Sequence, residues 1–291
     1  MSSPALSTRI KLQLNGLLHP IGLRLETTAS ERAEKSRFRQ LEVLGHWNKT
    51  QYDQGLKLDP QKHMEFLRET CLPYKTAYAK LPRVATGASQ EFYLDNGNFR
   101  GVDAELLYSV VRKYQPRHII EVGSGYSTRL MALAIREGNQ STALTSIDPE
   151  PRVDVDACVN KQVQSAVEHL DPNTLLQNLD EGDILFIDSS HQVVTGGDVP
   201  YLFLEVLPRL KKGVLIHIHD VFLPFDYPVE CFPWSWAEQY LVHAFLSFNS
   251  AFEILWPGRY MWSYDKTAIL DVIPTDPSIF PPSSLWLRKT L

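Results

Sequence analysis

Four side chains that could carry chemistry follow two apolar runs of the sequence. Asp188 and His191 come after ILFI, and His219 and Asp220 end the run GVLIHIHD. If the two runs are neighbouring strands about 4.8 Å apart, these side chains converge at one edge of a sheet. A histidine with its ordinary pKa of about 6.5 suits proton removal at neutral pH. His191 or His219 is therefore predicted to act as a general base beside Asp188, whereas His217, deeper in its strand, is expected to pack in the core.

A glycine-rich turn indicates a ligand-binding loop. The stretch IIEVGSGYST, residues 119–128, predicts a strand, a tight turn from Gly123 to Gly125 and the start of a helix. Such a turn would suit the pyrophosphate of a dinucleotide. However, Glu121 is expected to face the ligand, where its charge repels a pyrophosphate and attracts the ammonium and sulfonium of S-adenosylmethionine. Thr128 also stands where the dinucleotide fingerprint has a small residue, so a nicotinamide-dependent oxidoreductase is the less favoured alternative.

Short apolar runs alternate with helical patterns from about residue 99 onward. Nearly continuous apolarity is typical of parallel strands that helices cover on both faces. The predicted fold class is therefore α/β, with a doubly wound, Rossmann-like sheet whose ligands bind at the carboxyl ends of the strands. The four clearest runs lie at 117–122, 143–148, 183–188 and 213–220.

The last part of the chain departs from this alternation. A helix is predicted at 235–248 and strands at 252–256 and 283–289, with a long loop and no clear helix between the two strands. Two strands without a helical crossover are expected to pair antiparallel.

The N-terminal third has no glycine loop and predicts a mainly helical cap or dimerisation region. Ser30 is predicted as the N-cap of one helix that stops at Gly45. A second helix is predicted to start after Asp59-Pro60 and to run towards Pro73. A homodimer through these helices is one possible arrangement. The predicted domains are residues 1–98 and 99–291.

Composition and charge restrict the class of protein. The formal net charge is −5, which makes nucleic acid an unexpected partner. Cys71, Cys158 and Cys231 are too far apart for a disulfide framework or a C-x-x-C site. No apolar run reaches the roughly 18 to 20 residues of a membrane span. The first 26 residues could lie on a membrane surface or pack against protein, and a cytoplasmic location is expected.

These motifs resemble the class I S-adenosylmethionine-dependent methyltransferases. The resemblance covers about residues 99–291 and rests on EVGSGYST, SIDPE, ILFIDSSH and VLIHIHDVFLP as the ends of successive strands. It implies a seven-stranded sheet whose last strand is antiparallel and lies between the fifth and the sixth. It also implies S-adenosylmethionine as the cofactor.

The resemblance assigns cofactor contacts to individual residues. Glu121, Gly123 and Gly125 are expected around the methionine end of the cofactor. Asp148, at the end of the second strand, is expected to accept hydrogen bonds from the ribose hydroxyls. The remaining expected cofactor contacts are Ser124, Tyr126, Ser127 and Asp188.

The acceptor is expected to be an oxygen of a small molecule, either a hydroxyl or a carboxylate. The N/D-P-P-Y/F/W motif of the nitrogen-methylating members is absent, and Asp188-Ser-Ser-His191 follows the fourth strand instead. Some oxygen methyltransferases of this fold hold magnesium at the matching positions, here Asp188, His219 and Asp220. Because histidine departs from the oxygen ligands that magnesium prefers, a metal is not expected to be required. A protein that binds S-adenosylmethionine without catalysis is a further alternative.

The segment FLPFDYPVECFPWSW, residues 222–236, follows the fifth strand directly. Its aromatic residues could close over an acceptor and exclude water, or they could pack against the N-terminal helices. The candidate walls of the acceptor site are Tyr227, Trp234 and Trp236.

Overall fold

The computed structural model describes residues 6–22, 28–276 and 280–291, and the chain divides into two compact units. The N-terminal unit, residues 1–49, contains α1 (Leu6–Leu18) and α2 (Thr28–Val43). Ser30 lies inside α2, which already begins at Thr28, so the prediction of Ser30 as the N-cap was wrong. Gly45 follows the end of the helix, as predicted, and has a φ of 64°. The C-terminal unit comprises residues 50–291.

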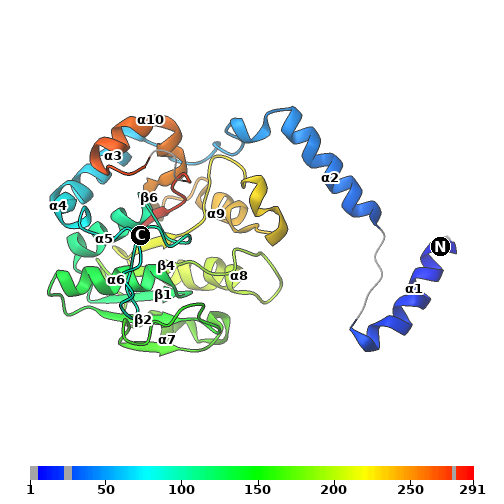
Figure 1. Cartoon of the computed structure of the whole chain (residues 1–291), viewed down its shortest axis with the longest axis horizontal. Coiled ribbons are helices and arrows are strands. Elements are labelled where there is room, and N and C mark those ends of the chain that lie inside the picture. The colour runs from blue at the N-terminus through cyan, green and yellow to red at the C-terminus, as the bar shows by residue number, and fades with distance from the viewer. Residues whose placement is uncertain (1–5, 23–27, 277–279) are drawn as a thin grey trace. The chain divides into compact units, whose positions relative to one another are not determined.

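The C-terminal unit is built on one seven-stranded sheet in the order β3-β2-β1-β4-β5-β7-β6 (Figure 1). Neighbours among β1 to β5 are parallel, and β7 is antiparallel to both β5 and β6. This confirms the predicted doubly wound sheet with its last strand between the fifth and sixth. The strands are β1 (His118–Val122), β2 (Ala143–Ile147), β3 (Lys161–Val163), β4 (Ile184–Ile187), β5 (Leu215–Ile218), β6 (Phe252–Pro257) and β7 (Leu285–Lys289).

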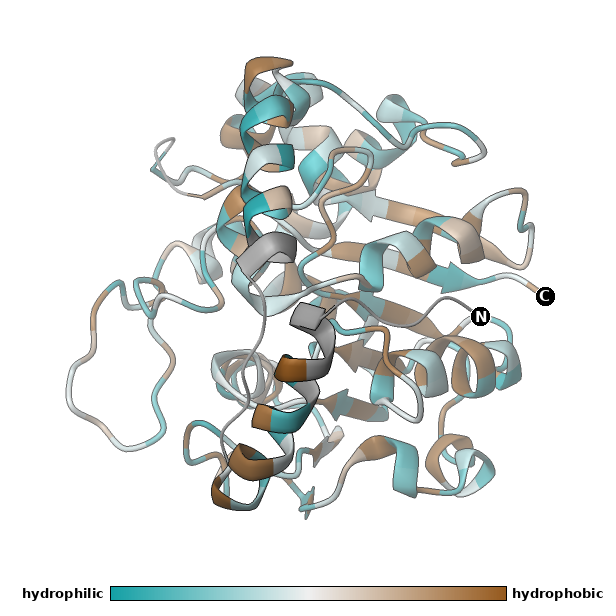
Figure 2. Ribbon diagram, turned by 90° about the vertical axis from the view of Figure 1, so that its right-hand side faces the viewer, coloured by the Kyte–Doolittle hydropathy of each residue, from teal (hydrophilic) through white to brown (hydrophobic). Residues whose placement is uncertain are grey.

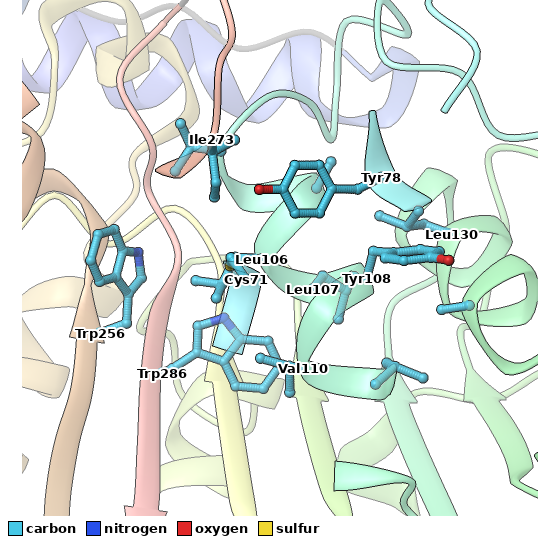
Figure 3. Packing of buried hydrophobic residues seen from close by; sticks show 14 of the residues in the cluster. Cys71, Tyr78, Leu106, Leu107, Tyr108, Val110, Leu130, Trp256, Ile273 and Trp286 are labelled. Carbon is cyan, nitrogen blue, oxygen red and sulfur yellow. The ribbon is translucent and has the colours of Figure 1, made fainter. Parts of the chain in front are cut away.

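The central strands β1, β4 and β5 bury both faces because their side chains alternate between two cores. Ile119 packs into one core with Phe186 and Leu107, and its neighbour Ile120 packs into the other with Leu185. Figure 2 shows the resulting apolar colour over much of the sheet. Figure 3 shows side chains of the first core, among them Leu107 and Trp286.

Helices cover both faces of the sheet. The first core receives side chains from α3 (Pro60–Cys71), α4 (Lys75–Tyr78), α5 (Asp103–Tyr114), α6 (Tyr126–Glu137) and α10 (Gly258–Val272). The second receives them from α7 (Pro172–Leu176), α8 (Asp198–Tyr201) with the π-helical turn after it, and α9 (Glu238–Leu246). Thus α3 and α4, expected in a separate cap, share the core of the C-terminal unit.

Helix α3 was predicted from the sequence, and helix α10 was not. Asp59 caps α3, and its carboxylate accepts hydrogen bonds from the backbone N–H groups of Gln61 and Lys62. The predicted start of this helix is therefore confirmed. In contrast, α10 occupies the segment for which a long loop was predicted, so that prediction was wrong. The helix is interrupted by a non-helical residue, Asp265, with a φ of −151°, which explains why no continuous helical pattern is visible there.

The sheet brings the ends of β1, β4 and β5 together. Val122 pairs with Ile187, and Ile187 pairs with Ile218, so the three strands end in line. The strand order also reverses between β1 and β4, the place where doubly wound sheets bind their ligands.

Candidate functional site

A large cleft opens at the carboxyl ends of the parallel strands. The loops after β1 to β5 line it, together with residues 97–103 and 280–283. Of the residues predicted to bind a cofactor or to react, the cleft receives Gly123, Ser124, Asp148, Asp188, His191, His219, Asp220, Trp234 and Trp236. The structure therefore gathers residues that lie more than 100 positions apart in the sequence.

The glycine loop passes close to the end of β4. Gly123 has a φ of 90°, and a Cβ atom placed on it would lie 2.0 Å from the carbonyl oxygen of Asp188. Only glycine fits this approach without a shift of the backbone. The hydroxyl of Ser124 donates a hydrogen bond to Oδ2 of Asp148 at 2.7 Å, which ties the loop to the end of β2.

Glu121 does not face the ligand of the loop, contrary to the prediction. Its side chain is fully buried, and its two oxygens accept hydrogen bonds from the hydroxyls of Ser127 and Thr128, each at 2.6 Å. Burial raises the pKa of Glu121 to about 8, although the two hydroxyls oppose the shift. Glu121 thus holds the first turn of α6 through Ser127 and Thr128. The charge of Glu121 therefore gives no reason to favour S-adenosylmethionine over a dinucleotide.

Two other loop residues are also turned to internal contacts. The side chain of Ser127 is buried against Glu121, and the hydroxyl of Tyr126 lies 2.9 Å from that of Tyr93. Neither side chain lines the cleft. Gly125 donates its backbone N–H to Oγ1 of Thr128 at 2.9 Å and so begins α6.

Asp148 lies in the cleft at the end of β2. Its Oδ1 accepts the backbone N–H of Glu150 at 2.8 Å, in addition to the bond from Ser124 to Oδ2. A carboxylate oxygen can accept more than one hydrogen bond, so both oxygens retain capacity for a ligand. Beside Asp148 the cleft is lined by Ala166, Val167 and Glu168, which follow β3. Sequence reasoning missed these three because β3 has only a short, weakly apolar pattern.

The side chains on the reaction side form one cluster. Nε2 of His191 lies 3.4 Å from Oδ1 of Asp188 and 3.6 Å from Oδ2 of Asp220. Nδ1 of His219 lies 3.6 Å from Oδ1 of Asp188 and 3.6 Å from Oδ1 of Asp220. The predicted convergence of these four residues is what the structure shows.

A second layer of acidic residues surrounds this cluster, and sequence reasoning missed it. Glu238, on α9, accepts a hydrogen bond from Nδ1 of His191 at 2.8 Å and is 1% exposed. Asp103, the first residue of α5, has an oxygen 4.0 Å from Nε2 of His219 and accepts the backbone N–H groups of Ser283 and Ser284. No local motif marks either acid, because their partners are distant in sequence.

Three of these residues could hold a metal ion. One ligand atom from each of Asp188, His191 and Asp220 lies within 4.8 Å of the others. His219 was predicted as the histidine of this group, but the structure has His191 there. Glu238 binds the opposite nitrogen of the ring, the arrangement that orients metal-binding histidines in proteins. Both His191 and Asp220 have left-handed backbone, with φ of 58° and 54°, and such strained residues cluster at functional sites.

The acidic surroundings change the protonation of the histidines. Burial alone would lower the pKa of His219, but the carboxylates of Asp220 and Asp188 outweigh burial and raise that pKa to about 9. The pKa of His191 is also raised, against burial, by Asp188 and Glu238. A histidine that is already protonated at neutral pH cannot accept a proton. Either histidine would have to lose this proton before it could act as a base or bind a metal.

In the aromatic loop after β5, the two tryptophans line the cleft and the tyrosine is buried behind them. Trp234 and Trp236 line the cleft with ring centroids 5.0 Å apart, and Trp236 lies 4.6 Å from the ring of His191. Tyr227 is buried behind them, and its hydroxyl accepts the backbone N–H of Gln239 at 2.9 Å. Tyr227 thus supports the wall instead of facing the cleft. His217 is buried against Phe186, as expected of a core residue.

Comparison with known families supports the resemblance. Residues 120–221 match the model of a family described as a methyltransferase domain. This segment includes the glycine loop, Asp148, Asp188 and the His219-Asp220 pair. Comparison with curated proteins gives no match to the sequence.

Solved structures give distant likenesses. PaMTH1, a methyltransferase of Podospora anserina crystallised with S-adenosylhomocysteine, is 16% identical with a TM-score of 0.39, over 93% of this chain and 100% of that one. A cmcI structure with Mg and S-adenosylmethionine is 14% identical with a TM-score of 0.40, over 74% and 84%. The plantazolicin methyltransferase BamL, with S-adenosylhomocysteine, is 15% identical with a TM-score of 0.38, over 65% and 83%. The match to the family model and the strand order support a methyltransferase-like fold.

The buried carboxyl group of Glu121 predicts a pH-dependent stability. Its pKa is raised from 4.5 to about 8 on folding, so it stabilises the folded state fully below pH 4.5 and progressively less up to pH 8. Between these limits the free energy of unfolding should fall by up to about 1.4 kcal/mol per pH unit relative to Glu121→Gln. Urea unfolding of both proteins across this range measures the difference. Glu150→Gln, which changes an exposed acid, is the control, and equal slopes for Glu121→Gln and wild type would contradict the assignment.

Proposed function

Because residues 120–221 match the model of a methyltransferase domain family, we propose that the protein transfers the methyl group of S-adenosylmethionine to an oxygen atom of a small molecule. One observation carries the proposal. The glycine loop and the cluster of Asp188, His191 and Asp220 line the same cleft. A cofactor loop thus lies beside side chains that can act on an acceptor.

The chain offers S-adenosylmethionine a matching set of groups. Asp148 would accept hydrogen bonds from the ribose hydroxyls, and Gly123 and Ser124 would border the methionine end. Ala166, Val167 and Glu168 would border the adenine, because they follow β3 next to Asp148. When bound, the cofactor supplies a methyl group on a sulfonium, which is already a good leaving group.

The donor set at Asp188, His191 and Asp220 fits a divalent metal ion. Two carboxylates and a neutral imidazole suit manganese, iron or zinc better than magnesium. Glu238 would hold Nδ1 of His191 so that Nε2 points to the other two ligands. When bound there, the metal supplies a Lewis acid that lowers the pKa of an acceptor hydroxyl. We therefore prefer a metal to the free histidine base.

The charge of the cleft favours a hydroxyl over a free carboxylate as the acceptor. Carboxylate side chains outnumber arginines along it by far, and an anionic acceptor would be repelled. The acidic residues that line it are Asp103, Asp148, Glu150, Glu168, Asp188, Asp198, Asp220 and Glu230, and the arginines are Arg100 and Arg152. One divalent cation neutralises only part of this excess.

The remaining work of the protein is alignment. Trp234 and Trp236 offer flat apolar walls to an acceptor, and with Phe222 and Phe280 they reduce the water around it. Holding acceptor and donor in line for displacement can lower the barrier by roughly 7 to 11 kcal/mol.

Thermal unfolding in the presence of ligands tests the proposed function. S-adenosylhomocysteine at 100 times its dissociation constant should stabilise the protein by about 2.7 kcal/mol and raise the unfolding midpoint by several degrees. NAD is the comparison ligand. A rise with S-adenosylhomocysteine justifies a screen of hydroxyl acceptors. A rise with NAD alone would overturn the proposal in favour of an oxidoreductase.

Asp148 should determine cofactor affinity. Asp148→Ala removes the carboxylate proposed to bind the ribose and also the partner of the Ser124 hydroxyl, so S-adenosylhomocysteine should bind at least tenfold more weakly, the effect of about 1.4 kcal/mol. Calorimetric titration measures this change. Glu150→Gln alters a nearby exposed carboxylate and should leave the affinity unchanged. Equal affinities of Asp148→Ala and wild type would place the ribose elsewhere.

Glu238 should determine metal affinity without touching the metal. Glu238→Ala releases the ring of His191 and should weaken Mn²⁺ binding by about 10- to 100-fold. Glu238→Gln keeps an acceptor oxygen and should have an intermediate affinity. Glu230→Gln, elsewhere in the cleft, is the matched control.

The measurement is titration of EDTA-treated protein with Mn²⁺, together with the unfolding midpoint of each metal-free variant. Equal Mn²⁺ affinity in Glu238→Ala and wild type would contradict the proposed orientation. Absence of Mn²⁺, Fe²⁺ and Zn²⁺ binding to wild type would return the role of base to the histidines.

A further inference from the structure

Helix α1 of the N-terminal unit presents an apolar row to solvent. Ile10, Leu14 and Leu17 are 48%, 41% and 76% exposed, and Ile21, just after the helix, is 68% exposed. The spacing of four and three residues places the three helical positions on one face, since consecutive residues differ by about 100°. Figure 2 shows brown apolar segments along this helix. An apolar row of this kind indicates a binding surface.

The charge of the same segment identifies the occupant. Helix α1 contains two basic residues, Arg9 and Lys11, and no acidic residue. The whole chain, in contrast, has a net charge of −5. A leucine-rich helix with basic and without acidic residues complements a surface that is apolar inside and anionic outside.

We propose that α1 binds the surface of an anionic lipid membrane and lies in its interfacial plane. At 13 residues the helix is too short to span a bilayer, and no helix in the described part of the chain is long and apolar enough to do so. It is also marginal as an isolated helix in water. Burial of Ile10, Leu14 and Leu17 among the acyl chains stabilises it, and the ammonium group of Lys11 contacts the lipid phosphates and carboxylates.

The membrane explains the sequence better than a second copy of the chain does. A pair of α1 helices from two copies would bring like charges together, because α1 has no acid to offer a basic residue of its partner. An anionic membrane meets both the apolar row and the positive charge. The proposal concerns the N-terminal unit and does not depend on the reaction at the cleft.

Vesicle sedimentation of the full-length protein tests the proposal. One vesicle is pure phosphatidylcholine, and the other is an equal mixture of phosphatidylcholine and phosphatidylserine. We expect the protein to pellet with the mixed vesicles at least tenfold more strongly, and to be released by high salt. Two variants with the same added charge distinguish the apolar face of α1 from the opposite face. Leu17→Asp changes the apolar row, whereas Asn15→Asp lies about 160° from Leu17 around the helix.

The proposal requires that Leu17→Asp lose at least tenfold in binding to mixed vesicles while Asn15→Asp keeps most of it. Thermal unfolding with S-adenosylhomocysteine, unchanged in both variants, shows that the C-terminal unit is intact. Lack of binding by wild type overturns the proposal. In that case, a dimer in size-exclusion chromatography that Leu17→Asp dissociates assigns the row to a second copy, and a monomer assigns it to the chain's own surface. Equal loss in both variants also overturns it.

Discussion

Two backbone hydrogen bonds beyond the strand ends position the reaction side of the cleft. The N–H of Asp188 donates to the carbonyl of Val122 at 3.0 Å, and the N–H of His219 donates to the carbonyl of Ile187 at 2.9 Å. They extend the pairing of β1, β4 and β5 by one residue. The glycine loop, Asp188 and His219 therefore lie at the same level of the sheet, directly after the paired strand ends. Because a shift of one residue would turn each side chain to the opposite face, the whole constellation depends on this register. The apolar packing on both faces of these strands holds the register in place.

Burial decides what the acidic residues at this edge do. Glu121 and Asp148 both end or nearly end a strand, and both accept a serine hydroxyl. Glu121 is fully buried under α6, whereas Asp148 lines the cleft. One carboxyl therefore supports the loop, and the other is available to a ligand. Sequence spacing alone does not separate these two cases.

The fold followed from the sequence because its signals are local. Apolar runs, the Gly123 turn and the helix start at Asp59-Pro60 each depend on a few adjacent residues, and they predicted the sheet and α3. The convergence of Asp188, His191, His219 and Asp220 followed from the same strands. The role of Glu238 could not be predicted, because its contact with His191 joins residues 47 apart in sequence. Helix α10 was missed because its pattern breaks at Asp265.

The same distant contacts bear on the metal ion that we propose for the cluster. Asp103, Asp188, Asp220 and Glu238 surround two buried histidines, and such a concentration of carboxylates is unfavourable unless positive charge balances it. The carboxylates raise the pKa of both histidines, which favours their positive, protonated form. A metal held by Nε2 of His191 would replace the proton of that ring. Trp234 is 52% exposed, and the proposed acceptor, by covering it, would gain roughly 25 cal/mol for each Å² of apolar surface buried. In the proposed function, charge balance would stabilise the bound metal, and apolar burial would stabilise the bound acceptor. The two sites would be neighbouring parts of one cleft.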